Sequence, residues 1–227
     1  MVPGTEFASV DAVVFDLDGV LVDSETIWDE LRREVAAVAG RAWPDDATRA
    51  MQGMSTPEWS RYLHDVVGIP EAPESIARTV IDGISARYRD HLPLIDGAIE
   101  AVTRLADHWP LGLASSSPAA LISTVLDVSG LAPAFQVAVS TEEVPAGKPA
   151  PDVYLTAAAR LGVRPDRAVA VEDSSNGLRA AAAAGLTVIA IPHAAFLPAP
   201  DALALAAVQL TGLDELTPEV VLKAAAR

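Results

Sequence analysis

The chain has 227 residues, of which 51% are hydrophobic and 5% aromatic, and it contains no cysteine. This length fits one large α/β domain, or one domain with an insertion, and the lack of cysteine excludes disulfides, thiolate catalysis and cysteine-based zinc sites. The formal net charge of −15 argues against binding to nucleic acids or anionic membranes. An anionic substrate would need local cations, and the chain has only two lysines, Lys148 and Lys223.

No apolar run approaches the roughly 18 residues of a membrane span, and residues 1–7 lack the basic and apolar regions of a secretory signal. We therefore expect a cytoplasmic protein, a monomer, with a small-molecule partner and no membrane or nucleic-acid partner. Residues 1–7 are either a native terminus or a remnant of cloning, and they are excluded from the fold prediction.

The first predicted element is a short buried strand at residues 12–15, which runs into Asp16, Leu17, Asp18 and Gly19. Residues i and i+2 of a strand point the same way, so the two carboxylates can converge where the strand ends. Gly19 allows a sharp turn there. Open α/β sheets usually bind ligands at such strand ends. These residues alone are compatible with a plain turn, an acid–base pair or a site for a cation such as Mg²⁺.

Residues 24–92 contain no convincing strand. Apolar residues at helical spacing, together with start and stop signals, predict helices at about residues 24–39, 45–51, 56–67 and 73–89.

Beyond residue 93, strands alternate with helices, which indicates a parallel, doubly wound sheet. Strands are expected at residues 111–114, 137–139, 168–171 and 187–191, and helices at residues 97–108, 118–128, 151–161, 178–184 and 213–227.

The predicted fold is therefore a Rossmann-like α/β core with an inserted helical domain. We assign residues 1–22 and 93–227 to the core and residues 23–92 to a helical cap. Since the chain leaves and re-enters the core beside Asp16 and Asp18, the cap is placed to act as a lid over the carboxyl edge of the sheet.

Four further candidate residues also lie at or just beyond strand ends. Ser115 ends the second strand, where the start of the next helix could bind a phosphate. Lys148 follows the third strand, and Glu172 and Asp173 end the fourth. Each residue alone could be a helix cap or an exposed loop residue. Because all of them fall on the same edge of the sheet, they are better explained by one shared site.

These stretches resemble the four-motif signature of the haloacid dehalogenase superfamily. They are, in chain order, Asp16-Leu-Asp18-Gly19, Ser115, Gly-Lys148-Pro-Ala-Pro-Asp and Glu172-Asp173-Ser-Ser-Asn-Gly. The resemblance is to the phosphatase and β-phosphoglucomutase-like branch with a helical cap, and it covers about residues 11–220.

The resemblance implies a role for each matching residue. Asp16 would be the nucleophile that forms an aspartyl-phosphate, and Asp18 the general acid and base. Mg²⁺ would be held by the Asp16 side chain, the Asp18 backbone carbonyl and Asp173. Glu172 would bind the ion through water or support its ligands.

The resemblance also implies a phosphate-binding set. Ser115, Ser116 and Lys148 would bind the transferring phosphoryl oxygens and neutralise the charge that grows on them. One metal ion and one lysine would then make the pocket cationic inside an acidic protein.

Within this superfamily, the Asp-x-Asp-Gly pattern argues against a dehalogenase, and a cap without lysine argues against a phosphonatase. The β-phosphoglucomutases carry a cap histidine where Trp28 stands, a basic residue near Thr56 and a lysine where Pro118 stands. Their absence favours a Mg²⁺-dependent phosphatase of small sugar phosphates, with a β-phosphoglucomutase-like mutase as the alternative. A non-catalytic phosphate-binding relative would lack a catalytic group, and none is missing.

The cap would set the identity of the substrate. The candidate residues for contact with the substrate are Gly19 of the first motif and, in the cap, Glu25, Trp28, Met54, Ser55 and Thr56. Trp28 could stack on a sugar ring or pack within the cap. His193 is interpreted as a histidine of a surface loop.

Overall fold

The computed structural model describes residues 10–51, 54–193 and 197–226, so the segment 1–7 discussed above lies outside the described residues. Within these ranges, no helix is both long enough and apolar enough to cross a membrane.

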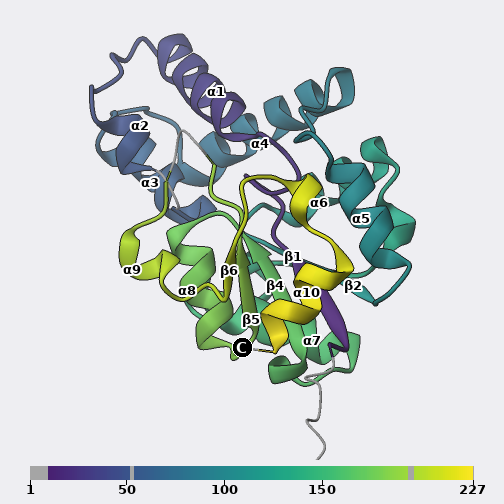
Figure 1. Ribbon diagram of the computed structural model, residues 1–227. Coiled ribbons are helices and arrows are strands. Elements are labelled where there is room, and N and C mark those ends of the chain that lie inside the picture. The colour runs from purple at the N-terminus through teal and green to yellow at the C-terminus, as the bar shows by residue number, and fades with distance from the viewer. Residues whose placement is uncertain (1–9, 52–53, 194–196, 227) are drawn as a thin grey trace, which may run out of the picture.

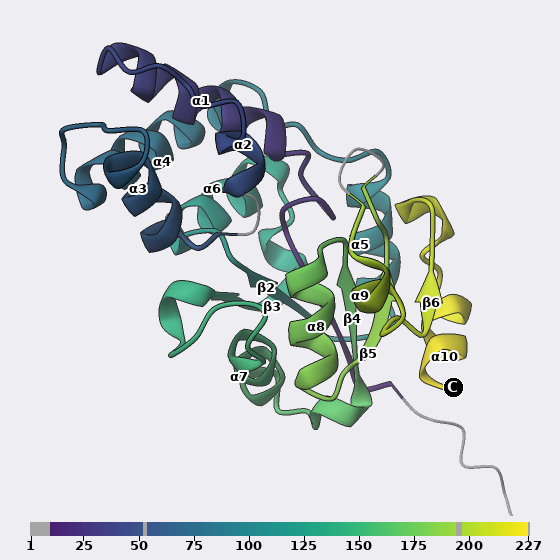
Figure 2. The ribbon, with the colours of Figure 1, turned by 90° about the vertical axis from the view of Figure 1, so that its left-hand side faces the viewer.

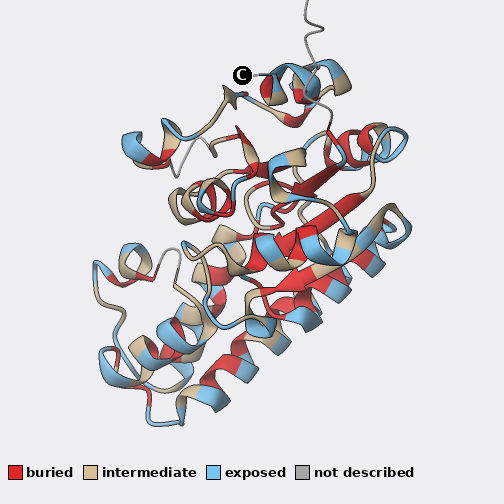
Figure 3. Ribbon diagram, turned by 90° about the horizontal axis from the view of Figure 1, so that it is seen from below, coloured by how far each residue is buried: buried red, intermediate tan, exposed pale blue. Residues whose placement is uncertain are grey.

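A six-stranded parallel sheet forms the centre of the fold (Figure 1). Its order is β3-β2-β1-β4-β5-β6, with β1 Ala12–Phe15, β2 Leu111–Ser115, β3 Phe135–Ser140, β4 Ala168–Glu172, β5 Thr187–Ala190 and β6 Val208–Gln209. Strands β1, β2 and β4 are wholly buried, as parallel strands covered on both faces should be (Figure 3). The predicted Rossmann-like α/β fold is confirmed.

Helices cover both faces of this sheet (Figure 2). Val13 and Phe15 of β1 pack in one cluster with α5, α6 and α10, whereas Val14 packs on the other face with α7 and α8, because successive side chains of a strand alternate. The helices of the core are α5 Ala98–Ala106, α6 Ala119–Ser129, α7 Asp152–Leu161, α8 Ser175–Ala183, α9 Pro200–Leu203 and α10 Pro218–Ala225, and its 3-10 turns are Ala132–Ala134, Thr141–Glu143, Pro165–Arg167 and Leu213–Glu215.

The strand order brings the motifs together. Strand β1 lies between β2 and β4, with Phe15 opposite both Leu113 and Val171. Asp16 therefore leaves the sheet between the ends of two strands that carry other motifs. The chain also crosses from β3 on one side of β1 to β4 on the other, and open α/β sheets bind ligands at such a switch point.

The remaining helices form a second group, which comprises α1 Glu25–Val38, α2 Ala47–Ala50, α3 Thr56–Asp65 and α4 Pro73–Asp90. They lie together beyond one end of the sheet (Figures 1 and 2), and α4 packs against α1, α3 and the core helix α6. The two connections to the core run side by side, because the Asp23 amide donates to Pro93 O at 2.9 Å and the Ile95 amide to Leu21 O at 3.0 Å. That residues 23–92 form a separate domain stays a prediction.

Three features of the C-terminal part differ from the predictions, and the first is the four-residue helix α9, which was not expected. Strand β6 was not expected, because it is two residues long and is defined by backbone hydrogen bonds, from the Ala207 amide to Val188 O and from the Leu210 amide to Ala190 O, each 2.8 Å. The last helix starts at Pro218 rather than at residue 213, since a 3-10 turn comes first and the Thr217 side chain caps the helix.

Candidate active site

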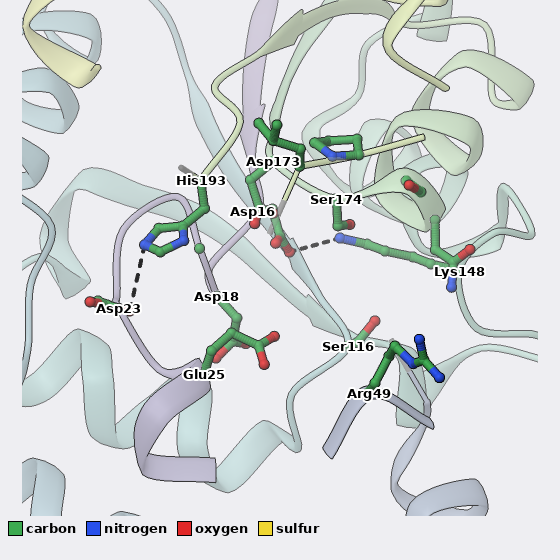
Figure 4. Close-up of a pocket in the computed structure, with 15 residues that line it drawn as sticks. Asp16, Asp18, Asp23, Glu25, Arg49, Ser116, Lys148, Asp173, Ser174 and His193 are labelled. Atoms are coloured by element: carbon green, nitrogen blue, oxygen red, sulfur yellow. Dashed lines mark hydrogen bonds and ion pairs between the residues drawn. The ribbon is translucent and has the colours of Figure 1, made fainter. Parts of the chain in front are cut away.

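Lys148 joins the ends of three strands at the carboxyl edge of the sheet. Its Nζ donates to Asp16 Oδ1 at 2.7 Å, to Glu172 Oε1 at 2.6 Å and to the backbone carbonyl of Ala114 at 3.0 Å. Figure 4 shows the lysine side chain reaching toward Asp16. The structure thus brings residues of the first, third and fourth motifs together beside the end of β2, which carries the second, although Asp16 and Glu172 are 156 positions apart in the chain.

These three side chains form a buried ion cluster. The exposed fraction is 5% for the side chain of Lys148, 8% for Asp16 and 0% for Glu172. Burial disfavours the charged lysine, but the carboxylates of Asp16 and Glu172 outweigh this effect and raise the pKa of Lys148. Burial also raises the pKa of Asp16 to about 8, with Lys148 opposing the rise and Glu172 and Asp18 adding to it. The cluster therefore has two carboxyl groups and only one lysine to pair with them.

Glu172 is held by hydrogen bonds at both carboxylate oxygens. Oε1 accepts from Lys148 and from the Tyr154 hydroxyl at 2.7 Å, and Oε2 accepts from the amides of Asp173 and Ser174 at 3.1 and 3.2 Å. A Cβ atom on Gly177 would lie 1.8 Å from Oε1, so the glycine of this motif leaves room for the carboxylate over the first turn of α8. Glu172 is thus placed to orient Lys148 and the loop after β4.

Asp16, Glu172 and Asp173 could together hold a metal ion. Each offers a carboxylate oxygen, and these oxygens lie within 4.8 Å of one another. Asp173 Oδ1 is buried and has no hydrogen-bond partner among the described residues. Burial, with the charges of Glu172 and Asp16, raises the pKa of Asp173 well above its usual range. A hard cation with oxygen ligands, such as Mg²⁺, fits this set because it would satisfy that oxygen and offset the charge.

Gly19 is required beside this carboxylate cluster. Its φ is +81°, which glycine tolerates best, and an added Cβ would lie 2.0 Å from Asp173 Oδ2. The first motif therefore needs glycine both for the turn and for the close approach of the fourth motif.

Asp18 is held by hydroxyls from the loop after β2. Ser117 Oγ donates to Asp18 Oδ2 at 2.7 Å, and Ser115 Oγ donates to the same oxygen at 3.3 Å. The Ser140 hydroxyl donates to Ser117 O at 2.7 Å and so holds this loop in place. Ser115, predicted to bind phosphate, is thus wholly buried against Asp18, whereas Ser116 lines the cavities described next.

Two cavities meet at Asp18, Glu25 and Ser116. The larger has a volume of about 420 Å³ and contains most of the predicted site residues (Figure 4); they are Asp16, Asp18, Gly19, Glu25, Ser116, Lys148 and Asp173. The smaller, of about 100 Å³, lies against helices α1 and α3, and the predicted residues that line it are Asp18, Glu25, Trp28, Met54, Thr56 and Ser116.

Ser55 lines neither cavity among the described residues. Its hydroxyl donates to Glu58 at 2.6 Å at the start of α3. His193 lies in the loop after β5, as interpreted from the sequence, and its partly exposed side chain also lines the larger cavity, with Nε2 3.9 Å from Asp23 Oδ1.

Several residues at the site were missed by the sequence analysis. Ser117 belongs to the Ser115-Ser116-Ser117 run and could have been found there, and Arg32 lies seven positions after Glu25, on the same side of a helix. Tyr154 and Arg49 give no such signal, because only the packing of the chain brings them to Glu172 and to the larger cavity.

Comparison with known proteins agrees with this geometry. Residues 10–185 match the family model of the haloacid dehalogenase-like hydrolases. The chain is 36% identical over 217 residues to hexitol phosphatase B of Escherichia coli, which covers 91% of this chain and 94% of the relative.

Two solved structures are similar over most of their length. CbbY from Rhodobacter sphaeroides in complex with phosphate has a TM-score of 0.83 at 27% identity, over 93% of this chain and 99% of the other. A putative β-phosphoglucomutase from Thermotoga maritima has a TM-score of 0.73 at 30% identity, over 93% of this chain and 98% of the other. The predicted superfamily is confirmed.

The close approach of Glu172 to Gly177 predicts that adding a methyl group at position 177 destabilises the fold. Gly177→Ala should displace Glu172, lower the melting temperature by several degrees and reduce activity, because Lys148 loses a fixed partner. Gly147→Ala is the matched control, since its nearest new contact would be an ordinary 3.7 Å to Thr141. Equal melting temperatures for the two variants in thermal unfolding would contradict the proposed crowding.

The raised pKa values of Asp16 and Asp173 predict how stability depends on pH. With a chelator present, the folded chain should bind more protons than the unfolded chain between the usual carboxyl range and about pH 8. The free energy of unfolding should therefore fall as pH rises through this window, by up to about 1.4 kcal/mol per pH unit for each extra proton.

Urea unfolding from pH 5 to pH 8 measures this slope. Asp173→Asn removes one of the two groups and should make the slope shallower, whereas Asp65→Asn, at an exposed position, should leave it unchanged. A wild-type stability that rises with pH across this window would show that the carboxylate cluster does not have the assigned effect.

Proposed function

The chain belongs to the haloacid dehalogenase-like hydrolase family and is a phosphoric monoester hydrolase; on this premise we propose that it is a Mg²⁺-dependent sugar phosphatase that forms an aspartyl-phosphate on Asp16. The observation that carries the proposal is the position of Asp16, which is bonded to Lys148 and opens on the larger cavity together with Asp18. A nucleophile, a cation and an acid are thereby gathered around one space.

In the first half-reaction, a carboxylate oxygen of Asp16 attacks phosphorus, and the bond between phosphorus and the ester oxygen breaks. The electron pair of that bond goes to the leaving oxygen, which takes a proton from Asp18. Ser115 and Ser117 position Asp18 for this transfer through their hydrogen bonds to its Oδ2. Lys148 and Ser116 face the phosphoryl oxygens and stabilise their charge.

In the second half-reaction, Asp18 takes a proton from a water molecule whose oxygen attacks phosphorus. The bond between phosphorus and Asp16 breaks, and its electron pair returns to the carboxylate. The products are the free alcohol and inorganic phosphate, and both aspartates end in their starting protonation states.

Asp16, Asp173 and the backbone carbonyl of Asp18 would hold Mg²⁺, with Glu172 behind them. The unpartnered Asp173 Oδ1 and the carboxylate cluster support this assignment. When bound, the ion would keep Asp16 ionised and offset charge on the phosphoryl group. It would also help an acidic chain to accept an anionic ester.

The relative named hexitol phosphatase B supports a sugar or sugar-alcohol phosphate as substrate. Likeness to a putative β-phosphoglucomutase keeps a mutase as the second candidate. Trp28 and Thr56 line the smaller cavity; mutases of this branch are expected to carry a histidine at the first position and a basic residue near the second, and this difference favours hydrolysis. A monomeric state, a cytoplasmic location and the absence of nucleic-acid partners stay predictions from composition.

The first test is replacement of the two aspartates. Asp16→Asn should abolish phosphate release, and Asp18→Asn should lower it by about 10²- to 10⁴-fold, with the fold intact by circular dichroism. Asp11→Asn is the control, because Asp11 is exposed at the opposite end of β1, where it pairs with Arg167. Full turnover by Asp16→Asn would exclude the covalent mechanism.

The second test is phosphate release from a panel of sugar and sugar-alcohol phosphates, with Mg²⁺ and with a chelator. Release should require the metal and should be confined to part of the panel. β-Glucose 1-phosphate with its bisphosphate activator belongs in the panel, and its isomerisation without phosphate release would identify a mutase instead.

A further inference from the structure

Arg32 is a cap residue that faces the smaller cavity and has no assigned role. Glu25, Trp28 and Arg32 are spaced three and four positions apart on α1, so they share one face of the helix. All three line the cavity of about 100 Å³, which also contains Asp18 and Ser116. Figure 4 shows Glu25 beside Asp18, at the end of α1 nearest to the carboxyl edge of the sheet.

Two tryptophans hold the guanidinium of Arg32. Its Cζ lies 4.9 Å from the ring centre of Trp28 and 4.9 Å from that of Trp59. Both rings are buried, and they contact each other edge to face with their centres 5.8 Å apart. Cation–π attraction at such distances fixes the guanidinium in place, so its N–H groups are oriented before any ligand binds.

Arg32 has no hydrogen-bond or ion-pair partner among the described residues, and its Nε is buried. Burial lowers the pKa of Arg32 to about 10, although the charges of Glu25, Asp29 and Asp18 oppose this. The next residue, Arg33, shows the usual outcome, since it donates to Asp29 and to Thr48 on the outer side of the cap. Buried polar groups nearly always have partners, so the buried, unpaired Nε of Arg32 beside this cavity points to a ligand.

The position of the smaller cavity indicates which part of the substrate would bind to Arg32. Asp18, the proposed acid, borders both cavities, whereas Asp16 and Lys148 border only the larger one. The phosphoryl group therefore belongs in the larger cavity, and the leaving oxygen beside Asp18 directs the carbon chain of the alcohol toward Arg32.

We propose that Arg32 determines substrate specificity by donating hydrogen bonds to hydroxyl oxygens of a neutral, polyhydroxylated leaving group. The proposal rests on the phosphatase function above and names the residue that selects its alcohol. Arg32 can only donate and an ionised Glu25 can only accept, and a hydroxyl can satisfy either. A second anionic group would meet the carboxylate of an ionised Glu25 in the same small space, which disfavours it. Trp28 then supports Arg32 rather than stacking on the sugar.

Three variants and three substrates, namely a hexitol phosphate, butyl phosphate and a phosphorylated sugar acid, test this role. Arg32→Lys and Arg32→Gln should lower kcat/KM for a hexitol phosphate by about 10- to 100-fold, the range expected for hydrogen bonds from a charged group. Neither should change kcat/KM for butyl phosphate, whose alcohol has no further hydroxyl, by more than about threefold. Arg61→Gln is the control, because Arg61 is an exposed arginine of the same cap and its loss should affect none of the three substrates.

The other outcomes would overturn the inference in distinguishable ways. An equal loss of kcat/KM on the hexitol phosphate and on butyl phosphate would show that Arg32 only supports the structure of the cap. If Arg32→Gln has a lowered melting temperature, the comparison is made with Arg32→Lys instead. A loss confined to a phosphorylated sugar acid would assign Arg32 to an anionic group. No phosphate release by the wild type from any substrate would instead reject the proposed function itself.

Discussion

The structure depends on one buried lysine that is shared by two carboxylates. Lys148 contacts Asp16, Glu172 and the end of β2 at once, so it ties together three strands whose carboxyl ends would otherwise present only negative charge and backbone carbonyls. Removing a partner from a buried ion pair is strongly destabilising. The same contact that holds the edge of the sheet also places a cation beside the proposed nucleophile, which links the stability of the fold to its chemistry.

Around this contact, close packing leaves little freedom. Glu172 is fixed by Tyr154 on one side and by the first amides after β4 on the other, and two glycines give the space that the carboxylates occupy. The charges at this edge are not balanced, because Asp16, Glu172 and Asp173 are three carboxyl groups around a single lysine. This excess of carboxylate oxygens is the feature that supports the proposed Mg²⁺ site within a strongly acidic chain.

The helical group contributes the other half of the site. Its two connections to the core run beside each other, so α1 begins next to Asp18 and carries Glu25, Trp28 and Arg32 along one face. The cap thereby adds donors, acceptors and aromatic surface next to a core that supplies the reacting groups. As proposed, the work is divided accordingly: residues of the core would carry out the reaction, and Arg32 of the helical group would select the alcohol beside Asp18.

The parallel core, the helical segment after β1 and the residues Asp16, Asp18, Lys148, Glu172 and Asp173 were predicted from the sequence, because apolar strands, glycines and polar strand ends are local signals. The tertiary structure alone showed that Ser115 faces Asp18, that Ser55 caps α3, that His193 and Arg49 line the larger cavity, and that β6 completes the sheet. It also showed that Arg32 rests on two tryptophans from different helices. Such contacts join residues distant in the chain, and their partners follow from packing and burial rather than from any local pattern.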